Sequence, residues 1–252
     1  MIKKISIVIP IFNEKNNISA LINEIKKTLN KKIVYEVIIV NDGSTDITKE
    51  FLSDINKKEK NIIVINHKKN YGQSMALITG IRNSNFDHIV TLDGDGQNDP
   101  KDIIKLINNF DEKILFMMVI GNRINRNDSP ARKIASRLAF RIRKIVLHDD
   151  TPDTGCAIKV FKKEDFLELP FFNHQHRFLP FLFKTFNGKV VSVPVNHRAR
   201  KSGVSKYSNF QRLLVGISDI FGVIWLNKRI TWPILLENNK KINISRRNKN
   251  GN

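Results

Sequence analysis

Short runs rich in Val and Ile alternate with amphipathic stretches along the first 120 residues of the chain. Such runs are typical of parallel strands that are buried on both faces of a sheet. The segments that we interpret as strands are 5–12, 35–42, 61–66, 88–93 and 114–121. Strands that alternate with helices predict an α/β fold with a mainly parallel, twisted sheet.

The stretches between these strands have the spacing of helices that bury one face. In the first of them the apolar positions that share a face are Ile18, Leu21, Ile22, Ile25 and Leu29. We predict three further helices within residues 44–58, 71–84 and 99–110. Ser44 or Thr45 is the expected N-cap of the helix in 44–58.

Three polar clusters follow predicted strands at the point where each strand ends. They read "PIFNE" at 10–14, "NDGSTD" at 41–46 and "DGDGQ" at 93–97. In open α/β sheets, ligands bind beyond the carboxyl ends of the strands. The three clusters therefore predict one site at one edge of the sheet.

Two aspartates one residue apart, Asp93 and Asp95, repel each other unless a cation lies between them. With Gln97 they offer the hard oxygen ligands that suit Mg²⁺ or Mn²⁺. Such an ion would bridge two phosphates of a nucleotide and stabilise a diphosphate leaving group. The alternative, that one aspartate caps the helix starting near Pro100, does not account for both.

The chain carries 43 Lys and Arg against 24 Asp and Glu, a formal net charge of +19. Three partners fit this excess: nucleic acid, an anionic membrane surface, or a phosphate-bearing substrate. Simple solvation of scattered lysines is the fourth interpretation. The single cysteine, Cys156, excludes an internal disulfide and fits a reducing compartment.

Residues 129–147 predict a basic amphipathic helix, with Ser129 as its cap and Pro130 at its first position. Its apolar stripe is Ile134, Leu138, Ile142 and Ile145. The basic residues that flank this stripe are Arg132, Lys133, Arg137, Arg141, Arg143 and Lys144. Such a helix favours a membrane surface, and the alternative is a helix packed on the domain with a solvated basic face. Arg132 and Ser136 either touch a lipid phosphate or belong to that solvated face.

Residues 209–237 hold a second apolar segment, whose core at 213–226 is fourteen residues long and contains Asp219. At about 1.5 Å per residue a helix of that length reaches roughly 21 Å, short of the roughly 30 Å of hydrocarbon in a bilayer. We therefore expect no transmembrane helix. Trp225, Trp232, Lys228 and Arg229 suit an interfacial helix or a docking face for a membrane partner. The N-terminus is interpreted as a strand and not as a signal peptide.

The segments "IVIPIFNE", "VIIVNDGSTD", "NYGQSMALITGI" and "TLDGDGQNDP", in this order, resemble a family 2 glycosyltransferase with the GT-A fold. Within that family the sequence is similar to dolichyl-phosphate mannosyltransferases and polyprenyl-phosphate glycosyltransferases. The resemblance covers residues 4 to about 207 and implies helices on both faces of the sheet. It divides the chain into a catalytic domain (1–207, with a nucleotide-binding half at 1–122 and an acceptor half at 123–207), an amphipathic segment at 208–237 and a basic, disordered tail at 238–252.

The resemblance also implies roles for single residues. Contact with the nucleotide is implied for Pro10, Phe12, Asn13 and Glu14, and Asp42 would recognise the nucleoside. The diphosphate and its metal would be held by Asp93, Gly94, Asp95 and Gln97. Asn41 and Gly94 depart from the aspartate and alanine that the family often has there, and neither change removes an essential ligand.

For the acceptor, the resemblance places Arg123, Arg200 and Lys206 near phosphate groups. Relatives that glycosylate hydroxyls often carry an acidic base where this chain reads "FFNHQHRFLPFL", with Arg177 and no carboxylate. A phosphomonoester, with its second pKa near 6, is already an anionic nucleophile at pH 7 and needs no such base. We expect Asp95, Arg123 and Arg200 to act directly in the transfer and Arg177 to compensate charge.

Two further polar groups carry less weight. His174 and His176 lack Cys or Glu companions at zinc-binding spacing, so we interpret them as lining the acceptor entrance. The segment "HDDTPD" at 148–153 looks like a second metal motif, but no strand leads into it and we interpret it as a loop.

Together these inferences predict an inverting, Mg²⁺- or Mn²⁺-dependent transferase. It would move a mannose- or glucose-type sugar from a GDP- or UDP-sugar to a dolichyl or undecaprenyl phosphate at the cytoplasmic face of the membrane. We expect a peripheral protein whose partners include an anionic membrane surface and a small integral membrane protein, and no nucleic acid. The rival predictions are a family 2 transferase with a hydroxyl acceptor, a nucleic-acid-binding protein, and a sugar nucleotidyltransferase, which would need a G-x-G-x-R loop that "PIFNEKNN" does not provide.

Overall fold

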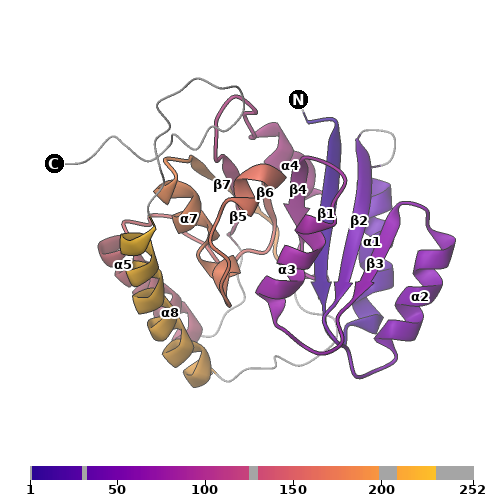
Figure 1. Ribbon diagram of the computed structural model, residues 1–252, viewed down its shortest axis with the longest axis horizontal. Coiled ribbons are helices and arrows are strands. Elements are labelled where there is room, and N and C mark those ends of the chain that lie inside the picture. The colour runs from indigo at the N-terminus through magenta and orange to yellow at the C-terminus, as the bar shows by residue number, and fades with distance from the viewer. Residues whose placement is uncertain (1, 30–32, 125–129, 199–208, 231–252) are drawn as a thin grey trace.

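The computed structural model describes residues 2–29, 33–124, 130–198 and 209–230. Its centre is a seven-stranded sheet in the order β3-β2-β1-β4-β6-β5-β7 (Figure 1). The strands are β1 (Lys4–Ile11), β2 (Val34–Asn41), β3 (Ile62–Asn66), β4 (His88–Thr91), β5 (Met118–Arg123), β6 (Lys159–Lys162) and β7 (Val190–Val195). Within this sheet only β6 runs antiparallel to its neighbours, so the predicted mainly parallel α/β sheet is confirmed.

Helices cover both faces of the sheet, as expected. One face packs on α1 (Lys15–Leu29), α2 (Thr48–Lys58) and α4 (Asp102–Asn108). The other face packs on α3 (Gln73–Arg82), α6 (Lys163–Leu167), α7 (Leu179–Thr185) and α8 (Asn209–Arg229). Helix α5 (Pro130–Val146) lies next to α8 at one end of the molecule (Figure 1).

The strand β1 shows why the apolar runs are continuous. Its residues Ile5, Ile7 and Ile9 belong to the core under α1, whereas Val8 belongs to the core under α3. Alternate side chains point to opposite faces of a strand, and both faces here are dry. A strand in which every second residue was polar would place polar side chains in the core on one face of the sheet.

Two local predictions are wrong. The segment 114–121 was expected to be a strand throughout, but β5 begins only at Met118. Phe116 has a φ of 50° and its ring stacks on Phe186, with ring centres 4.6 Å apart. A residue with that backbone angle turns the chain instead of extending it, because β-strands require negative φ.

The second error concerns the start of α2. Neither Ser44 nor Thr45 caps it, because the helix begins at Thr48. The backbone N–H of Thr48 instead donates to the Asp46 carboxylate at 3.0 Å. Ser44 and Thr45 bond to the first polar loop, which is described below.

In the second half of the sheet only β5 was predicted from the sequence. The elements missed there are β6, α6, a 3₁₀ turn at Gln175–Arg177, α7 and β7. The segment 148–153 is a loop, as expected. Among the helices of the described residues, none is both long and apolar enough to cross a membrane.

Candidate active site

The first two polar clusters are joined by Asn13. Its φ of 57° is a left-handed conformation that Asn tolerates better than most residues. In this conformation its backbone N–H donates to Ser44 Oγ at 2.9 Å, and its side-chain oxygen accepts the backbone N–H of Thr45, also at 2.9 Å. The loops after β1 and β2 therefore form one surface, as the position of both strand ends predicts.

Asp42 is buried and its carboxylate is bonded to the loop before α3. The acid accepts hydrogen bonds from the backbone N–H groups of Tyr71 at 2.9 Å and Gly72 at 2.8 Å. The Nδ1 atom of His67 lies 2.7 Å from the same carboxylate. Asp42 thus fixes the entry to α3, and its contact with a nucleoside stays a prediction.

The acidic turn after β4 is organised by contacts at both of its ends. Asp93 accepts a hydrogen bond from Gln73 Nε2 at 2.8 Å, and Asp95 accepts the backbone N–H of Gln97 at 3.1 Å. The side-chain nitrogen of Gln97 donates to the backbone oxygen of Arg198 at 3.2 Å. This contact leaves the amide oxygen of Gln97 as the atom that can ligate a cation.

Gly94 is required by the close approach of the acidic turn to β1. A Cβ atom at this position would lie 2.4 Å from Ile11 Cγ2 and 3.4 Å from the backbone oxygen of Pro10. The first distance is far below any real carbon–carbon contact. The alanine that related sequences often carry here therefore does not fit in this chain without movement of Ile11.

The donor set of the acidic turn fits a hard divalent cation. It supplies two carboxylates and one amide oxygen within five residues, and Mg²⁺ and Mn²⁺ prefer such oxygen ligands. In the described part of the chain, no group of three or more His, Cys, Asp or Glu side chains is placed to hold a metal by itself. A cation bound here would therefore complete its shell with substrate or water oxygens.

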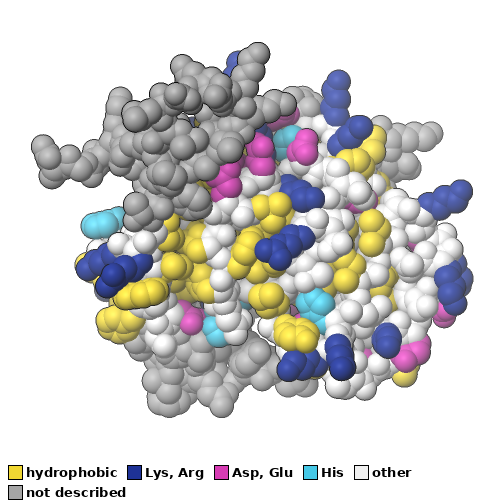
Figure 2. Space-filling view, in the orientation of Figure 1, with side chains coloured by type: hydrophobic (Ala, Val, Ile, Leu, Met, Phe, Trp, Pro, Cys, Tyr) yellow, Lys and Arg dark blue, Asp and Glu magenta, His cyan; other side chains and the backbone are white. Residues whose placement is uncertain are grey.

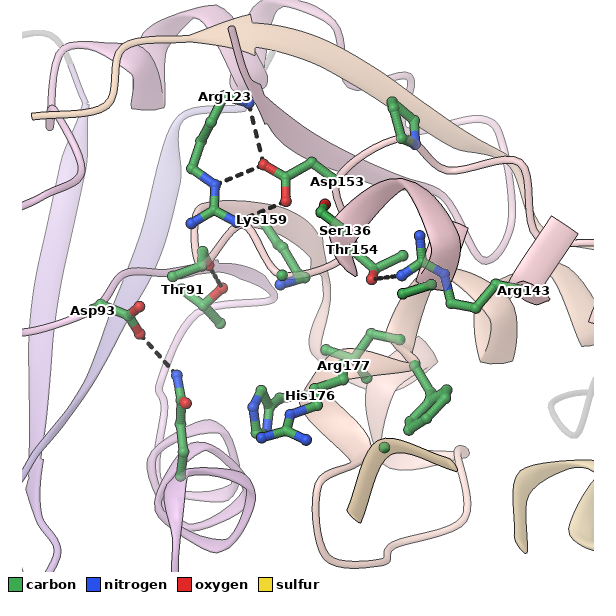
Figure 3. Close-up of a pocket in the computed structure, with 18 of the residues that line it drawn as sticks. Thr91, Asp93, Arg123, Ser136, Arg143, Asp153, Thr154, Lys159, His176 and Arg177 are labelled. Carbon is green, nitrogen blue, oxygen red and sulfur yellow. Dashed lines mark hydrogen bonds and ion pairs between the residues drawn. The ribbon is translucent and has the colours of Figure 1, made fainter. Parts of the chain in front are cut away.

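A cavity of about 630 Å³ opens beside the acidic turn (Figure 3). Asp93 lines it from the turn after β4, and α5 and α8 line it through Leu138, Ile142 and Ile220, among others. Its charged and polar lining includes Arg123, Arg143, Asp153, Lys159, His176 and Arg177. Asp93 of the acidic turn thus lines the same cavity as several cationic side chains.

Arg123 is paired with Asp153, a residue that sequence analysis did not assign to the site. Arg123 Nε lies 2.6 Å from one carboxylate oxygen of Asp153 and Nη2 lies 2.7 Å from the other (Figure 3). Burial alone would lower the pKa of Arg123, but this pair more than offsets it and raises the pKa above its ordinary value. Arg123 therefore lines the cavity with its orientation fixed from the loop between α5 and β6, and its contact with an acceptor phosphate stays a prediction.

Lys159 is the second residue that was missed. It lies on β6, is 3% exposed, and its ammonium group donates to the backbone oxygen of Cys156. Burial lowers its pKa, because a charged ammonium group loses its hydration there. The one available signal was a lysine inside the apolar run "CAIKVF", since a buried lysine usually has a specific purpose.

Arg143 corrects the description of α5 as a helix with an outward basic face. Its guanidinium group turns inward, where it donates to Thr154 Oγ1 and, at 3.2 Å, to the backbone oxygen of Thr151. The side chain is 15% exposed and its Nε lies 3.8 Å from the Asp149 carboxylate. Arg143 therefore ties α5 to the loop that carries Asp153, whereas Arg137 and Arg141 remain exposed.

The two histidines of the "HQH" segment have different partners. His174 Nδ1 lies 2.9 Å from Asp219 of α8, and His176 Nδ1 lies 2.8 Å from Ser74 of α3. They therefore do not converge on one zinc ion. His176 lines the cavity, and its place at an acceptor entrance stays a prediction. Arg177 also lines the cavity, and its Nη1 is 3.9 Å from Asp219.

Some predicted positions lie outside the described residues. They include Arg200, Lys206, Trp232 and the tail 238–252. The side chain of Arg132 is likewise not described. Their assigned roles stay predictions.

The sheet order and its helix layers define the GT-A fold. Crystal structures of glucosyl-3-phosphoglycerate synthase from Mycobacterium tuberculosis share this architecture, including one with Mn²⁺, UDP and glucosyl-3-phosphoglycerate and one with Mg²⁺ and UDP. The first aligns with a TM-score of 0.65 and 18% identity, over 91% of this chain and 81% of that one. At that identity the likeness establishes the fold alone.

Within that fold the chain belongs to glycosyl transferase family 2, whose sequence profile matches residues 6–169. Relatives named undecaprenyl-phosphate 4-deoxy-4-formamido-L-arabinose transferase share 35% identity in Enterobacter sp. (strain 638) and 33% in Klebsiella pneumoniae (strain 342). Each alignment covers 84% of this chain and 65% of the relative. The chain thus spans slightly less than two thirds of the length of these proteins.

Proposed function

We propose that this protein is an inverting glycosyltransferase that moves one sugar from a nucleotide diphosphate to a polyprenyl phosphate. The observation that carries the proposal is the cation-rich cavity next to the acidic turn, with Arg123, Lys159 and Arg177 in its wall. Its described lining holds two carboxylates, Asp93 at the donor side and Asp153, which is bonded to Arg123. A cavity of this kind suits an anionic acceptor, and both of its carboxylates already have partners, Asp93 in Gln73 and Asp153 in Arg123.

The reaction follows from these positions. An oxygen of the acceptor phosphate attacks the anomeric carbon of the donor sugar from the face opposite the diphosphate. The carbon–oxygen bond to the diphosphate breaks, its electron pair leaves with the nucleoside diphosphate, and the configuration inverts. No proton needs to be removed, because a phosphomonoester with a second pKa near 6 is largely a dianion at pH 7.

In this step, side chains of the protein orient the acceptor phosphate and compensate its negative charge. Arg123 binds phosphate oxygens with two N–H groups in a fixed direction, since Asp153 holds its guanidinium group. Lys159 and Arg177 add positive charge where two anions must approach each other. A divalent cation held by Asp93, Asp95 and Gln97 would neutralise the diphosphate as it leaves.

The names of the relatives support an undecaprenyl phosphate acceptor. They also make 4-deoxy-4-formamido-L-arabinose a donor sugar to test beside the mannose and glucose types. Arg200 and Lys206 enter this proposal as further phosphate ligands, on the strength of the family pattern alone.

The end of the molecule formed by α5 and α8 fits an anionic membrane surface. Its exposed apolar side chains are Leu138, Ile145, Val146, Phe221 and Trp225. Figure 2 shows hydrophobic side chains gathered at this end beside Lys and Arg side chains. Because the same two helices line the cavity, a lipid phosphate held at the membrane would reach the site without crossing water.

The transfer is tested with the full chain and a panel of GDP- and UDP-sugars, including mannose, glucose and 4-deoxy-4-formamido-L-arabinose donors. Undecaprenyl phosphate and dolichyl phosphate in detergent serve as acceptors, and lipid-linked sugar is the readout. We expect product with at least one donor, and its loss when EDTA is added. Transfer to hydroxyl acceptors with none to either lipid phosphate would contradict the proposal and favour the rival family 2 activity.

Membrane contact is tested by sedimentation with phosphatidylglycerol and with phosphatidylcholine vesicles. Phe221 and Trp225 are four residues apart on one side of α8 and are 69% and 62% exposed. We expect the double variant Phe221→Ser/Trp225→Ser to bind phosphatidylglycerol vesicles several-fold more weakly. Ile47→Ser, at an equally exposed position beside α2, is the matched control and should bind like the parent. Equal binding by all three proteins would point to a protein partner at this end.

A further inference from the structure

Ser74 and His176 form a pair that joins the two halves of the site. Ser74 is in the first turn of α3, and His176 is in the 3₁₀ turn Gln175–Arg177. Ser74 Oγ accepts the backbone N–H of His176 at 3.2 Å and lies 2.8 Å from Nδ1 of the same residue. The imidazole is therefore held through both its backbone and its ring.

The bonding of Ser74 favours the Nε2–H tautomer of His176. Ser74 is 2% exposed, so its single hydroxyl hydrogen needs an acceptor inside the protein. Nδ1 of His176 is in position to be that acceptor. With Nδ1 as that acceptor, the hydroxyl hydrogen is satisfied inside the protein, and the proton of the neutral ring is on Nε2.

His176 also stays neutral. Burial lowers the pKa of its imidazole well below 6.5, and the positive charges of Lys159, Arg177 and His174 lower it further. Since Nδ1 is turned back toward Ser74 and the residue lines the cavity, we infer that the opposite ring edge, with Nε2, faces the cavity. The cavity wall thus presents His176 as a neutral hydrogen-bond donor beside the cationic donors Lys159 and Arg177.

We propose that His176 Nε2–H donates a hydrogen bond to an oxygen of the acceptor phosphate, with Ser74 as its positioning residue. The proposal deepens the transfer to a lipid phosphate and rests on it. Figure 3 shows His176 and Arg177 across the cavity from Arg123, with Lys159 between them. N–H groups on both sides of the cavity can then hold the acceptor phosphate, while one phosphate oxygen stays directed at the sugar of the nucleotide-sugar.

A neutral donor has an advantage over an imidazolium ion at this place. An imidazolium ion with a pKa near 6.5 could pass its proton to a phosphate whose second pKa is near 6. The phosphate would then be a poorer nucleophile. The neutral ring with its proton on Nε2 holds the oxygen and leaves it unprotonated.

The tautomer is tested without any substrate, by ¹⁵N-histidine labelling of the full chain and two-bond ¹⁵N–¹H correlation spectra. We expect the His176 signals of the neutral Nε2–H form from pH 6.5 to pH 8, and a mixture of tautomers in Ser74→Ala. Signals of the Nδ1–H form or of an imidazolium ion at pH 7 in the parent protein would overturn the proposal. This readout holds even if the chain transfers sugar to a different acceptor.

The contact is tested by comparing His176→Phe and His176→Gln, with melting temperatures to confirm that both fold. We expect the KM for the lipid phosphate to rise about ten- to hundredfold in His176→Phe, the usual range for a lost hydrogen bond to a charged group. His176→Gln keeps an N–H donor and should recover part of the loss, and the KM for the nucleotide-sugar should not change in either. An increase confined to the KM for the nucleotide-sugar would overturn the proposal. Absence of any lipid-linked product from the parent would instead refute the proposed function.

Discussion

Asp153 holds Arg123 through two parallel hydrogen bonds of 2.6 and 2.7 Å, although the two residues lie thirty positions apart. The acid comes from a loop between α5 and β6, and the arginine from the end of β5. Both side chains are largely buried, with 6% and 16% exposed. Removal of either partner therefore leaves a charge in a site that water reaches poorly.

This pair predicts a non-additive effect on stability. We expect Asp153→Leu and Arg123→Met each to lower the free energy of unfolding by roughly 3 kcal/mol, because each leaves one buried charge unpaired. The double variant should lose less than the sum of the two, since it leaves none. Urea unfolding of the four proteins forms a double-mutant cycle that measures this difference. Additive losses would show that the pair does not act as a unit.

Gly94→Ala should destabilise the chain through its contact with Ile11. The new methyl group would lie 2.4 Å from Ile11 Cγ2, so β1 or the acidic turn must shift. We expect a loss of about 1–3 kcal/mol in the free energy of unfolding, as is usual for overpacking. Ile11→Ala removes the atom that clashes, so Gly94→Ala should cost much less in that background. An equal cost in both backgrounds would contradict this explanation.

Asp95→Asn should weaken metal-dependent binding of nucleoside diphosphates. The substitution keeps the shape of the side chain and removes one negative charge from a cation site. By titration calorimetry with GDP and UDP, we expect binding in Mg²⁺ or Mn²⁺ to fall at least about tenfold and binding in EDTA to stay the same. Asp54→Asn, an exposed position on α2, is the control and should behave like the parent. A variant that retains full metal-dependent affinity would remove Asp95 from the metal site.

His176 should make the protein less stable in mild acid. Its pKa in the folded protein lies well below 6.5, whereas an unfolded histidine has a pKa near 6.5. Below about pH 6.5 the unfolded chain therefore binds a proton that the folded chain does not, so stability falls as the pH falls. Above pH 6.5 the contribution is fully present. The slope cannot exceed about 1.4 kcal/mol per pH unit for one group.

The comparison that isolates this group is the parent protein against His176→Gln. Urea unfolding at pH 7.5, 6.5 and 5.5 should show the difference in stability between the two changing in favour of the variant as the pH falls. A constant difference across the three values would mean that His176 does not titrate abnormally.

The first half of the sheet could be predicted from the sequence because its signals are local. Each strand there is a mostly apolar run, and the polar clusters that follow β1, β2 and β4 reach the same edge of the sheet. The N-cap at Ser44 was misassigned for a physical reason: its hydroxyl accepts from Asn13, thirty-one residues away, and is not used for the helix. A short-range pattern does not reveal such a competing partner.

The wall of the cavity around Lys159 and Asp153 could not be predicted in the same way because pairing between distant segments creates it. β6 is only four residues long, and its register with β4 places Lys159 opposite Thr91, two residues before Asp93. Nothing near Lys159 or Asp153 in the sequence marks either as a neighbour of the acidic turn. Arg123 was assigned through the family resemblance, but its partner was not.

The reversed direction of β6 has a consequence for how such enzymes diversify. Its neighbours β4 and β5 deliver residues to the edge of the sheet that carries the acidic turn as the chain leaves them, whereas β6, which runs antiparallel to both, delivers them as the chain arrives. The loop that precedes β6 can therefore change in length and chemistry without altering the strands that precede the polar clusters. Under the proposed function, grafting that single loop between homologues would exchange acceptor preference while the sugar-nucleotide specificity is inherited unchanged.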